Sequence, residues 1–144
     1  MEKFTSIIRY TLIFIFLTTF LDKILDYSSF KHQLFLSPLI PYSYIEVIGV
    51  STIVFEAMIL FCLIINKLTV YGLFLSSFLL STFGFYLLFL VISFKFNKPC
   101  GCGFIFSFLS YNQHITLNFL LSIASALILI FNENFHPRLK YTSL

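Results

Sequence analysis

The residues best suited to chemistry in this chain of 144 residues are two cysteines separated by one glycine. Cys100 and Cys102 follow Pro99, and Gly101 gives the backbone the freedom to bring the two sulfur atoms within bonding range. A disulfide between them would close a very small ring, which constrains the unfolded chain little and tends to be strained. Strained, accessible disulfides are oxidising and are typical of labile or catalytic pairs. The pattern favours a dithiol/disulfide pair over a structural crosslink, with two incidental thiols as the alternative.

His114 adds an imidazole that could serve this pair in two ways. A titratable imidazole beside a dithiol supplies the proton transfer that thiol exchange needs. Alternatively, His114 could join Cys100 and Cys102 as a ligand of Cu(I) or zinc. The one-residue gap between the cysteines fits no common zinc module, so we expect no metal site. Cys62 lies roughly 25–30 Å away, near the far end of a helix, and is expected to be an inert packing residue.

Two further polar residues are expected at membrane depth. Glu56 stands twelve residues after Tyr44, about 18 Å along a helix, and charged groups in such a position usually face the interior of a bundle. A neutral, hydrogen-bonded carboxyl is the favoured interpretation of Glu56, and proton handling beside a redox cofactor is the alternative. Asn118 follows His114 by one turn, and both should begin the fourth helix, where Asn118 could bond across helices.

Lys23 stands between two acids at the end of the first apolar segment. Asp22 and Asp26 share one helix face, so Lys23 is expected to pair with either of them at the membrane interface. The alternative is that Lys23 lies beside the cysteine loop and favours a thiolate electrostatically.

The composition indicates which structural elements hold the cysteines and polar residues in place. Hydrophobic residues make up 59% of the chain and charged residues only 10%, against about 25% charged in soluble domains. This excludes a water-soluble globule, and a net charge of +3 is too small to indicate nucleic-acid binding. Apolar segments at about 7–25, 44–65, 68–94 and 115–131 predict an all-α integral membrane bundle of four transmembrane helices in a single domain, 1–144, with a polar tail at 132–144.

The connections between these segments add detail. The loop 26–43 contains Pro38 and Pro41, which disfavour helix just before them, and could carry a short interfacial helix. Asn66 and Lys67 leave room only for a tight turn, so the second and third helices should form an antiparallel hairpin. The first segment has no small-residue cleavage site and is expected to be a retained span. Basic residues near the helix ends divide five against four, which favours cytoplasmic termini and an outward-facing cysteine loop.

Taken together, these positions resemble the MauE/DoxX-like family of redox-associated four-helix membrane proteins. The resemblance extends from about residue 7 to 131, and its most specific element is the Cys-Gly-Cys loop after the third helix. The other matching positions are Arg9, Lys23, Pro41, Glu56 and Asn118. It implies a role in forming or maintaining disulfides in exported proteins, often alongside thioredoxin-like partners.

The resulting hypothesis is a thiol/disulfide redox protein of the bacterial inner membrane, surrounded by lipid. Cys100 would exchange with the dithiol of a thioredoxin-like or other exported thiol protein, and Cys102 would resolve the mixed disulfide. His114 would assist catalysis, and a quinone near His114 and Asn118 would accept electrons, with Glu56 and Lys23 as further cofactor-binding candidates. A noncatalytic anchor or assembly subunit for a redox partner and a metal-handling membrane protein are the alternatives.

Overall fold

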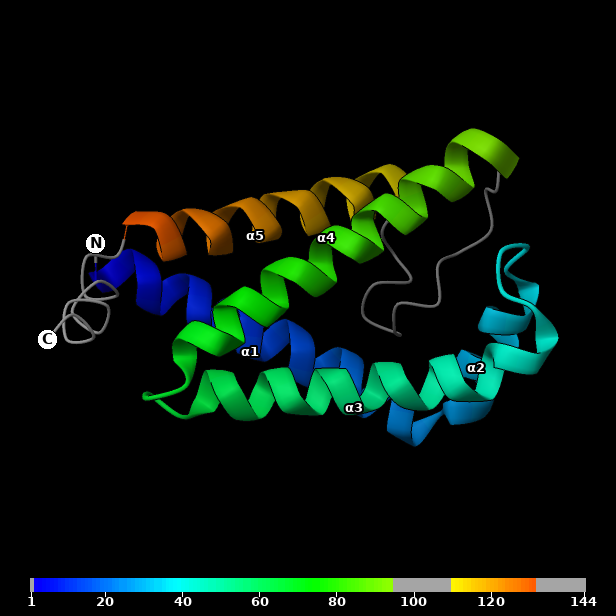
Figure 1. Cartoon of the computed structure of the whole chain (residues 1–144), viewed down its shortest axis with the longest axis horizontal. Helices are drawn as coiled ribbons and strands as arrows, with labels where there is room; N and C mark the ends of the chain where they lie inside the picture. The colour runs from blue at the N-terminus through cyan, green and yellow to red at the C-terminus, as the bar shows by residue number, and fades with distance from the viewer. Residues whose placement is uncertain (1, 95–109, 132–144) are drawn as a thin grey trace, which may run out of the picture.

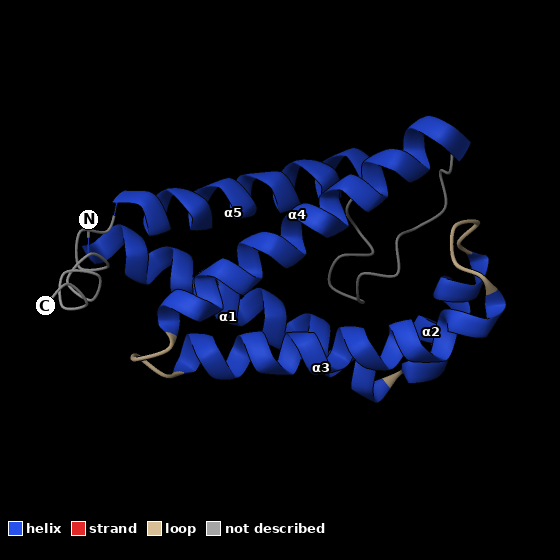
Figure 2. Cartoon of the chain, in the orientation of Figure 1, coloured by secondary structure: helices blue, strands red, loops and turns tan. Residues whose placement is uncertain are grey.

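The computed structural model describes residues 2–94 and 110–131. Its elements are α1 (Glu2–Leu25), α2 (Tyr27–Leu36), the 3-10 helix η1 (Tyr42–Tyr44), α3 (Ile45–Ile64), α4 (Thr69–Phe94) and α5 (Tyr111–Phe131). No strand occurs in these two ranges (Figure 2). Four helices, α1, α3, α4 and α5, are long and apolar enough to cross a membrane. The predicted all-α, four-helix membrane bundle is therefore confirmed.

The helix boundaries follow the apolar segments closely in the middle of the chain and less closely elsewhere. Helices α3 and α4 begin and end within one residue of their predicted limits, but α1 starts at Glu2 and α5 at Tyr111, several residues earlier than expected. Both early starts add polar turns, because a helix can extend beyond the hydrocarbon layer into water. The short helix expected in the first loop is present as α2.

Helix α2 has a clear start signal. The side chain of Asp26 accepts hydrogen bonds from the backbone N–H of Ser29, at 3.1 Å, and from the hydroxyl of Ser28, at 2.9 Å. Asp26 is therefore the N-cap of α2. The hydrogen bonds from Ser29 and then Ser28 lower the pKa of the Asp26 carboxyl. This cap fixes the point at which the chain leaves α1 and turns into α2.

The long helices run along the long axis of the molecule (Figure 1). The N-terminus, the turn between α3 and α4 and the end of α5 lie at one end, which we call the turn end; α2, the start of α3 and the end of α4 lie at the other, which we call the α2 end. Helices α3 and α4 are consecutive and antiparallel, as predicted, and their turn is closed by a 2.9 Å hydrogen bond from Leu68 N to Ile65 O.

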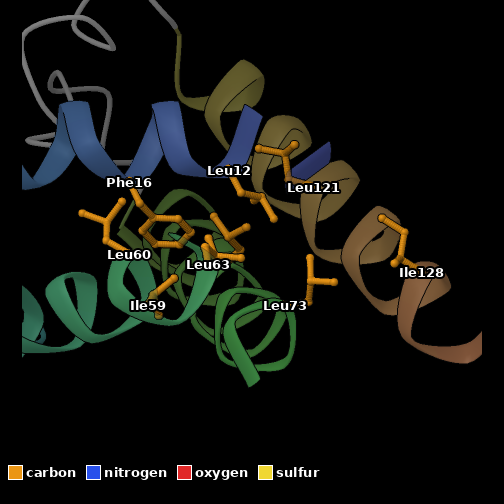
Figure 3. Close-up of a cluster of buried hydrophobic side chains, with 9 residues drawn as sticks. Leu12, Phe16, Ile59, Leu60, Leu63, Leu73, Leu121 and Ile128 are labelled. Atoms are coloured by element: carbon orange, nitrogen blue, oxygen red, sulfur yellow. The ribbon is translucent and has the colours of Figure 1, made fainter. Parts of the chain in front are cut away.

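The hydrophobic core lies toward the turn end. Its buried side chains come from α1, α3, α4 and α5, and those labelled in Figure 3 are Leu12, Phe16, Ile59, Leu60, Leu63, Leu73, Leu121 and Ile128. Large apolar side chains such as Phe14, Phe78 and Ile92 are instead exposed on the outside of the bundle. Such an exterior suits hydrocarbon better than water.

Arg9 joins α1 to the α3–α4 turn. Its Nε donates to Leu63 O at 2.7 Å, its Nη2 donates to Ile64 O at 2.8 Å, and its Nη1 donates to Asn66 Oδ1 at 2.6 Å. The last carbonyl groups of a helix have no partner within the helix. A guanidinium group, with five N–H donors in a planar fork, can satisfy two of them at once.

The α3–α4 hairpin is packed closely enough to yield a stability prediction. A Cβ atom added at Gly72 would lie 2.9 Å from both the backbone N and the Cδ2 of Leu63. Because a backbone atom cannot move aside as a side chain can, Gly72→Ala should lower the free energy of unfolding by about 1–3 kcal/mol. Thermal unfolding in detergent measures the change.

Gly84→Ala is the matched control. Its new Cβ would lie 3.3 Å from ring atoms of Phe119, a side chain that can shift slightly, and alanine favours helix over glycine by up to about 1 kcal/mol. Gly84→Ala should therefore unfold at a higher temperature than Gly72→Ala. Equal unfolding temperatures for the two variants would show that the close approach of Gly72 to Leu63 does not exclude a larger side chain.

Candidate functional site

A cavity of about 380 Å³ lies among the helices toward the α2 end. All five α-helices of the described residues contribute to its lining, which is mostly aliphatic and aromatic. Its polar lining residues are Thr19 and Lys23 from α1, Thr52 and Glu56 from α3, Thr82 and Tyr86 from α4, and His114 and Asn118 from α5. The volume falls within the range of small-molecule sites, which are typically apolar with a few convergent polar groups.

The strongest electrostatic feature of this cavity is a buried ion pair. Lys23 Nζ donates to Glu56 Oε1 at 2.7 Å, and each side chain is only 7% exposed. Lys23 Nζ also donates to Thr19 O at 3.5 Å and lies 5.3 Å from the ring centroid of Phe30. Lys23 is thus held by a carboxylate, a helix carbonyl and an aromatic face from three different helices.

This pair corrects the predictions made for two residues: Lys23 has a different partner from those expected, and Glu56 is an ion-pair partner where a neutral, hydrogen-bonded carboxyl was favoured. Asp22 and Asp26 were expected to be its partners, but Lys23 turns inward to Glu56, and Asp26 caps α2 instead. The physical reason is the cost of burial: Glu56 is 6% exposed at the middle of an apolar helix. A charge placed there is stabilised only by a nearby countercharge or hydrogen bonds.

Glu56 and Asn118, two polar residues of the cavity lining, have hydrogen-bonding capacity that is not used within the described residues. Glu56 Oε2 is buried and has no hydrogen-bond partner among the residues that the structure describes. The hydroxyl of Thr19, also in the lining, donates within its own helix to Ile15 O and Phe16 O. The side-chain amide of Asn118 is 8% exposed and makes no hydrogen bond to another residue of the described ranges.

Helix α2 covers this end of the bundle and is fixed to it by side chains. Ser37 Oγ and Tyr86 OH share a 2.5 Å hydrogen bond, which connects the end of α2 to α4. Lys31 pairs with Glu46, and Tyr27 OH donates to Glu46 Oε1 at 3.1 Å. The Glu46 carboxylate raises the pKa of the Lys31 ammonium. Phe30 and Leu34, on the same helix α2, are two apolar members of the cavity lining.

The structure brings together four of the six residues predicted to form a site. Lys23, Glu56, His114 and Asn118 come from three helices and all line the one cavity, with His114 only 3% exposed. Cys100 and Cys102, predicted to be catalytic, lie outside the described residues. Those residues include the flanking ends of the chain, Phe94 in α4 and Ser110 just before α5.

Cys62 lies outside the candidate site, and the metal hypothesis depends mainly on the two other cysteines. Cys62 is buried near the end of α3 and is not part of the cavity lining, as expected of a packing residue. Within residues 2–94 and 110–131, no group of three His, Cys, Asp or Glu side chains could hold a metal ion. Two of the three hypothetical ligands, Cys100 and Cys102, fall outside these ranges.

The sequence prediction missed the hydroxyl groups of the cavity. Thr19 and Thr52 each precede a charged member of the ion pair, Lys23 and Glu56, by four residues, so they share its helix face. That four-residue spacing could have identified both threonines from the sequence. Tyr86 carries no comparable local signal, because its partner Ser37 is 49 residues away in the sequence.

Four apolar helices around a cavity with a buried ion pair define an integral, multi-pass membrane protein. The sequence profile that matches this chain is that of the family described as "Methylamine utilisation protein MauE", and the match covers residues 1–131. The chain therefore belongs to the MauE family, as the resemblance predicted. No curated protein and no solved structure matches it.

Proposed function

We propose that this MauE family protein is a membrane thiol/disulfide redox protein that supports disulfide formation in exported proteins. The observation behind the proposal is the convergence of Lys23, Glu56, His114 and Asn118 on one cavity. The cavity lies toward the α2 end, where α4 ends before the Cys100–Cys102 segment. We place this end at the outer face of a bacterial inner membrane, following the distribution of basic residues.

The proposed reaction has two halves. A thiolate of the partner, a thioredoxin-like or other exported thiol protein, attacks Cys100 Sγ of the Cys100–Cys102 disulfide and releases the Cys102 thiolate. The second partner thiolate attacks the partner sulfur of this mixed disulfide, so the partner becomes a disulfide and Cys100 leaves as a thiolate. Two electrons and two protons pass in total from the partner to the cysteine pair, and His114 is the candidate to hold a proton.

Re-oxidation of the cysteine pair requires an acceptor of two electrons and two protons. A quinone has this stoichiometry and the apolar body that the cavity lining suits, and it would leave as the quinol. The residues present fit such a molecule: the lining is largely aliphatic and aromatic, and Asn118 has an amide available to hydrogen-bond a ring oxygen. Lys23 and Glu56 would form the polar part of the same site.

Thiol trapping in intact cells tests this proposal. In Cys102→Ser, the Cys100 thiolate can still run the exchange in reverse by attacking the disulfide of the oxidised partner, and the mixed disulfide should accumulate, because Cys102 is not there to attack Cys100 Sγ and release the partner. Acid quenching, alkylation and non-reducing electrophoresis reveal it as a band that disappears with reductant. Cys62→Ser should behave as the parent, because Cys62 is buried away from the cavity.

The double variant Cys100→Ser/Cys102→Ser separates catalysis from assembly. It should leave partner thiols reduced if the pair is catalytic. Unchanged partner oxidation in this variant would refute the catalytic proposal and favour a noncatalytic assembly subunit.

A further inference from the structure

One carboxylate oxygen at the polar end of the cavity has no hydrogen-bond donor among the described residues. Glu56 Oε2 is a buried acceptor without a partner in the described part of the chain. Lys23 is directed to the other carboxylate oxygen, to Thr19 O and to the Phe30 ring. Buried carboxylate oxygens are normally satisfied, and because Glu56 lines the cavity, a molecule bound there could supply the missing O–H or N–H group.

The charge balance of the cavity restricts the ligand further. Lys23 and Glu56 neutralise each other at 2.7 Å. An anionic ligand would face the Glu56 carboxylate, and a cationic one would face the Lys23 ammonium, so either would add an uncompensated buried charge. The ligand expected from this balance is uncharged.

The rest of the lining defines the body of the ligand. Phe16, Phe30 and Phe83 provide aromatic surfaces, and Leu34 and Leu79 provide aliphatic ones. A volume of about 380 Å³ accommodates one substituted ring with part of an attached chain. An uncharged apolar molecule with a hydroxyl donor at one end therefore fits the cavity in shape, charge and hydrogen bonding.

We propose that the cavity binds the reduced, quinol form of a quinone, with a ring hydroxyl donating to Glu56 Oε2. Asn118 hydrogen-bonds the ligand from α5, and Lys23 is a positioning residue that holds the Glu56 carboxylate in place. This inference rests on the proposed function, which supplies the quinone as electron acceptor, and adds that the site prefers its reduced form. A quinone has acceptors only, so it would leave Glu56 Oε2 without a donor.

The preference has a thermodynamic consequence for electron flow. A site that binds the quinol more tightly than the quinone raises the reduction potential of the bound couple, by about 30 mV for each tenfold difference in affinity. Electrons are thereby drawn from the cysteine pair toward the cavity. The same hydrogen bond that recognises the ligand would thus set the direction of transfer.

Binding measurements on purified protein carrying Cys100→Ser/Cys102→Ser test the inference without thiol chemistry. The probes are a benzoquinone with a ten-carbon alkyl tail and the quinol obtained from it by anaerobic reduction. Equilibrium dialysis in detergent should show that the quinol binds roughly tenfold or more tightly than the quinone, as expected for one hydrogen bond to a charged group.

Two paired variants identify the residue responsible. Lys23→Met/Glu56→Gln removes both buried charges, and the glutamine amide can donate as well as accept, so the two probes should bind within about threefold of each other. Lys31→Met/Glu46→Gln removes an exposed ion pair outside the lining and should preserve the quinol-to-quinone ratio. Circular dichroism confirms that each variant is folded.

Each outcome bears on the inference. Equal binding of quinone and quinol to the parent, or a quinol preference that survives Glu56→Gln, would overturn it. Dioctanoylglycerol, which also joins a hydroxyl donor to apolar chains, is the lipid arm; if it binds and the quinol does not, the ligand is a lipid alcohol and the quinol assignment is wrong. Quinol binding together with unchanged partner oxidation in Cys100→Ser/Cys102→Ser would refute the proposed function and leave the site standing.

Discussion

Replacing Lys23 with methionine is expected to lower the free energy of unfolding by about 3–5 kcal/mol, the usual cost of removing one member of a buried ion pair. The reason is that Glu56, 6% exposed in the middle of α3, loses its only cationic hydrogen-bond partner within the described residues. Methionine keeps the length and apolar character of the lysine stem, so the change is largely one of charge.

The double variant Lys23→Met/Glu56→Gln provides the control. It removes both charges, and replacing a complete buried pair with neutral groups is often nearly neutral for stability. It should therefore recover most of the stability lost in Lys23→Met, and a double-mutant cycle gives the coupling energy. If Lys23→Met alone were as stable as the parent, the ion pair would not contribute to the stability of the fold.

The buried cysteine of α3 offers a direct readout for these variants. The chain has three cysteines and no tryptophan, so Cys62 is the sole thiol in a Cys100→Ser/Cys102→Ser background. Because Cys62 is buried, a fluorogenic maleimide reacts with it only when the bundle opens. The temperature or denaturant concentration at which fluorescence rises therefore measures unfolding in detergent.

Arg9→Met is expected to lower the free energy of unfolding by about 2–4 kcal/mol, the net effect of losing charge-assisted hydrogen bonds at a helix end. The three bonds of Arg9 end on Leu63 O, Ile64 O and Asn66 Oδ1. Partial access of water to the turn limits the loss, because Ile64 and Asn66 are exposed. The Cys62 assay measures this variant in the same background.

Arg9→Lys and Lys67→Met test whether geometry or charge matters. Lysine keeps the charge but lacks the planar fork, so Arg9→Lys should recover only part of the stability. Lys67 is an exposed basic residue of the same turn, and Lys67→Met should unfold as the parent does. Full recovery in Arg9→Lys would show that charge alone accounts for the effect.

The fold was largely predictable from the sequence, because lipid requires long runs of apolar side chains whatever the details of packing. The early starts of α1 and α5 were not, since a polar first turn resembles a loop in composition. The rotation of each helix about its own axis was also hidden: when almost every position is apolar, periodicity no longer distinguishes the face that meets other helices from the face that meets lipid.

The candidate site was predicted as a set of residues but not as an arrangement. Glu56 and Asn118 were identified because polar groups are costly in hydrocarbon, and His114 because its imidazole could serve the cysteine pair; the structure places all three at the cavity. The partner of Lys23 was predicted wrongly, because neighbouring acids in sequence were preferred to one 33 residues away. That choice depends on which way α1 faces, which packing decides.

The bonds of Arg9 have a further consequence for how the protein is made. Its acceptor Leu63 follows it by 54 residues, and Glu56 follows Lys23 by 33. At synthesis rates of about 5–20 residues per second, Arg9 waits roughly 3–11 s on the ribosome for its acceptor. Arg9 and Lys23 thus both enter the insertion machinery before their partners exist. Helix α1 therefore reaches its final position only after α3 has been delivered to the bilayer.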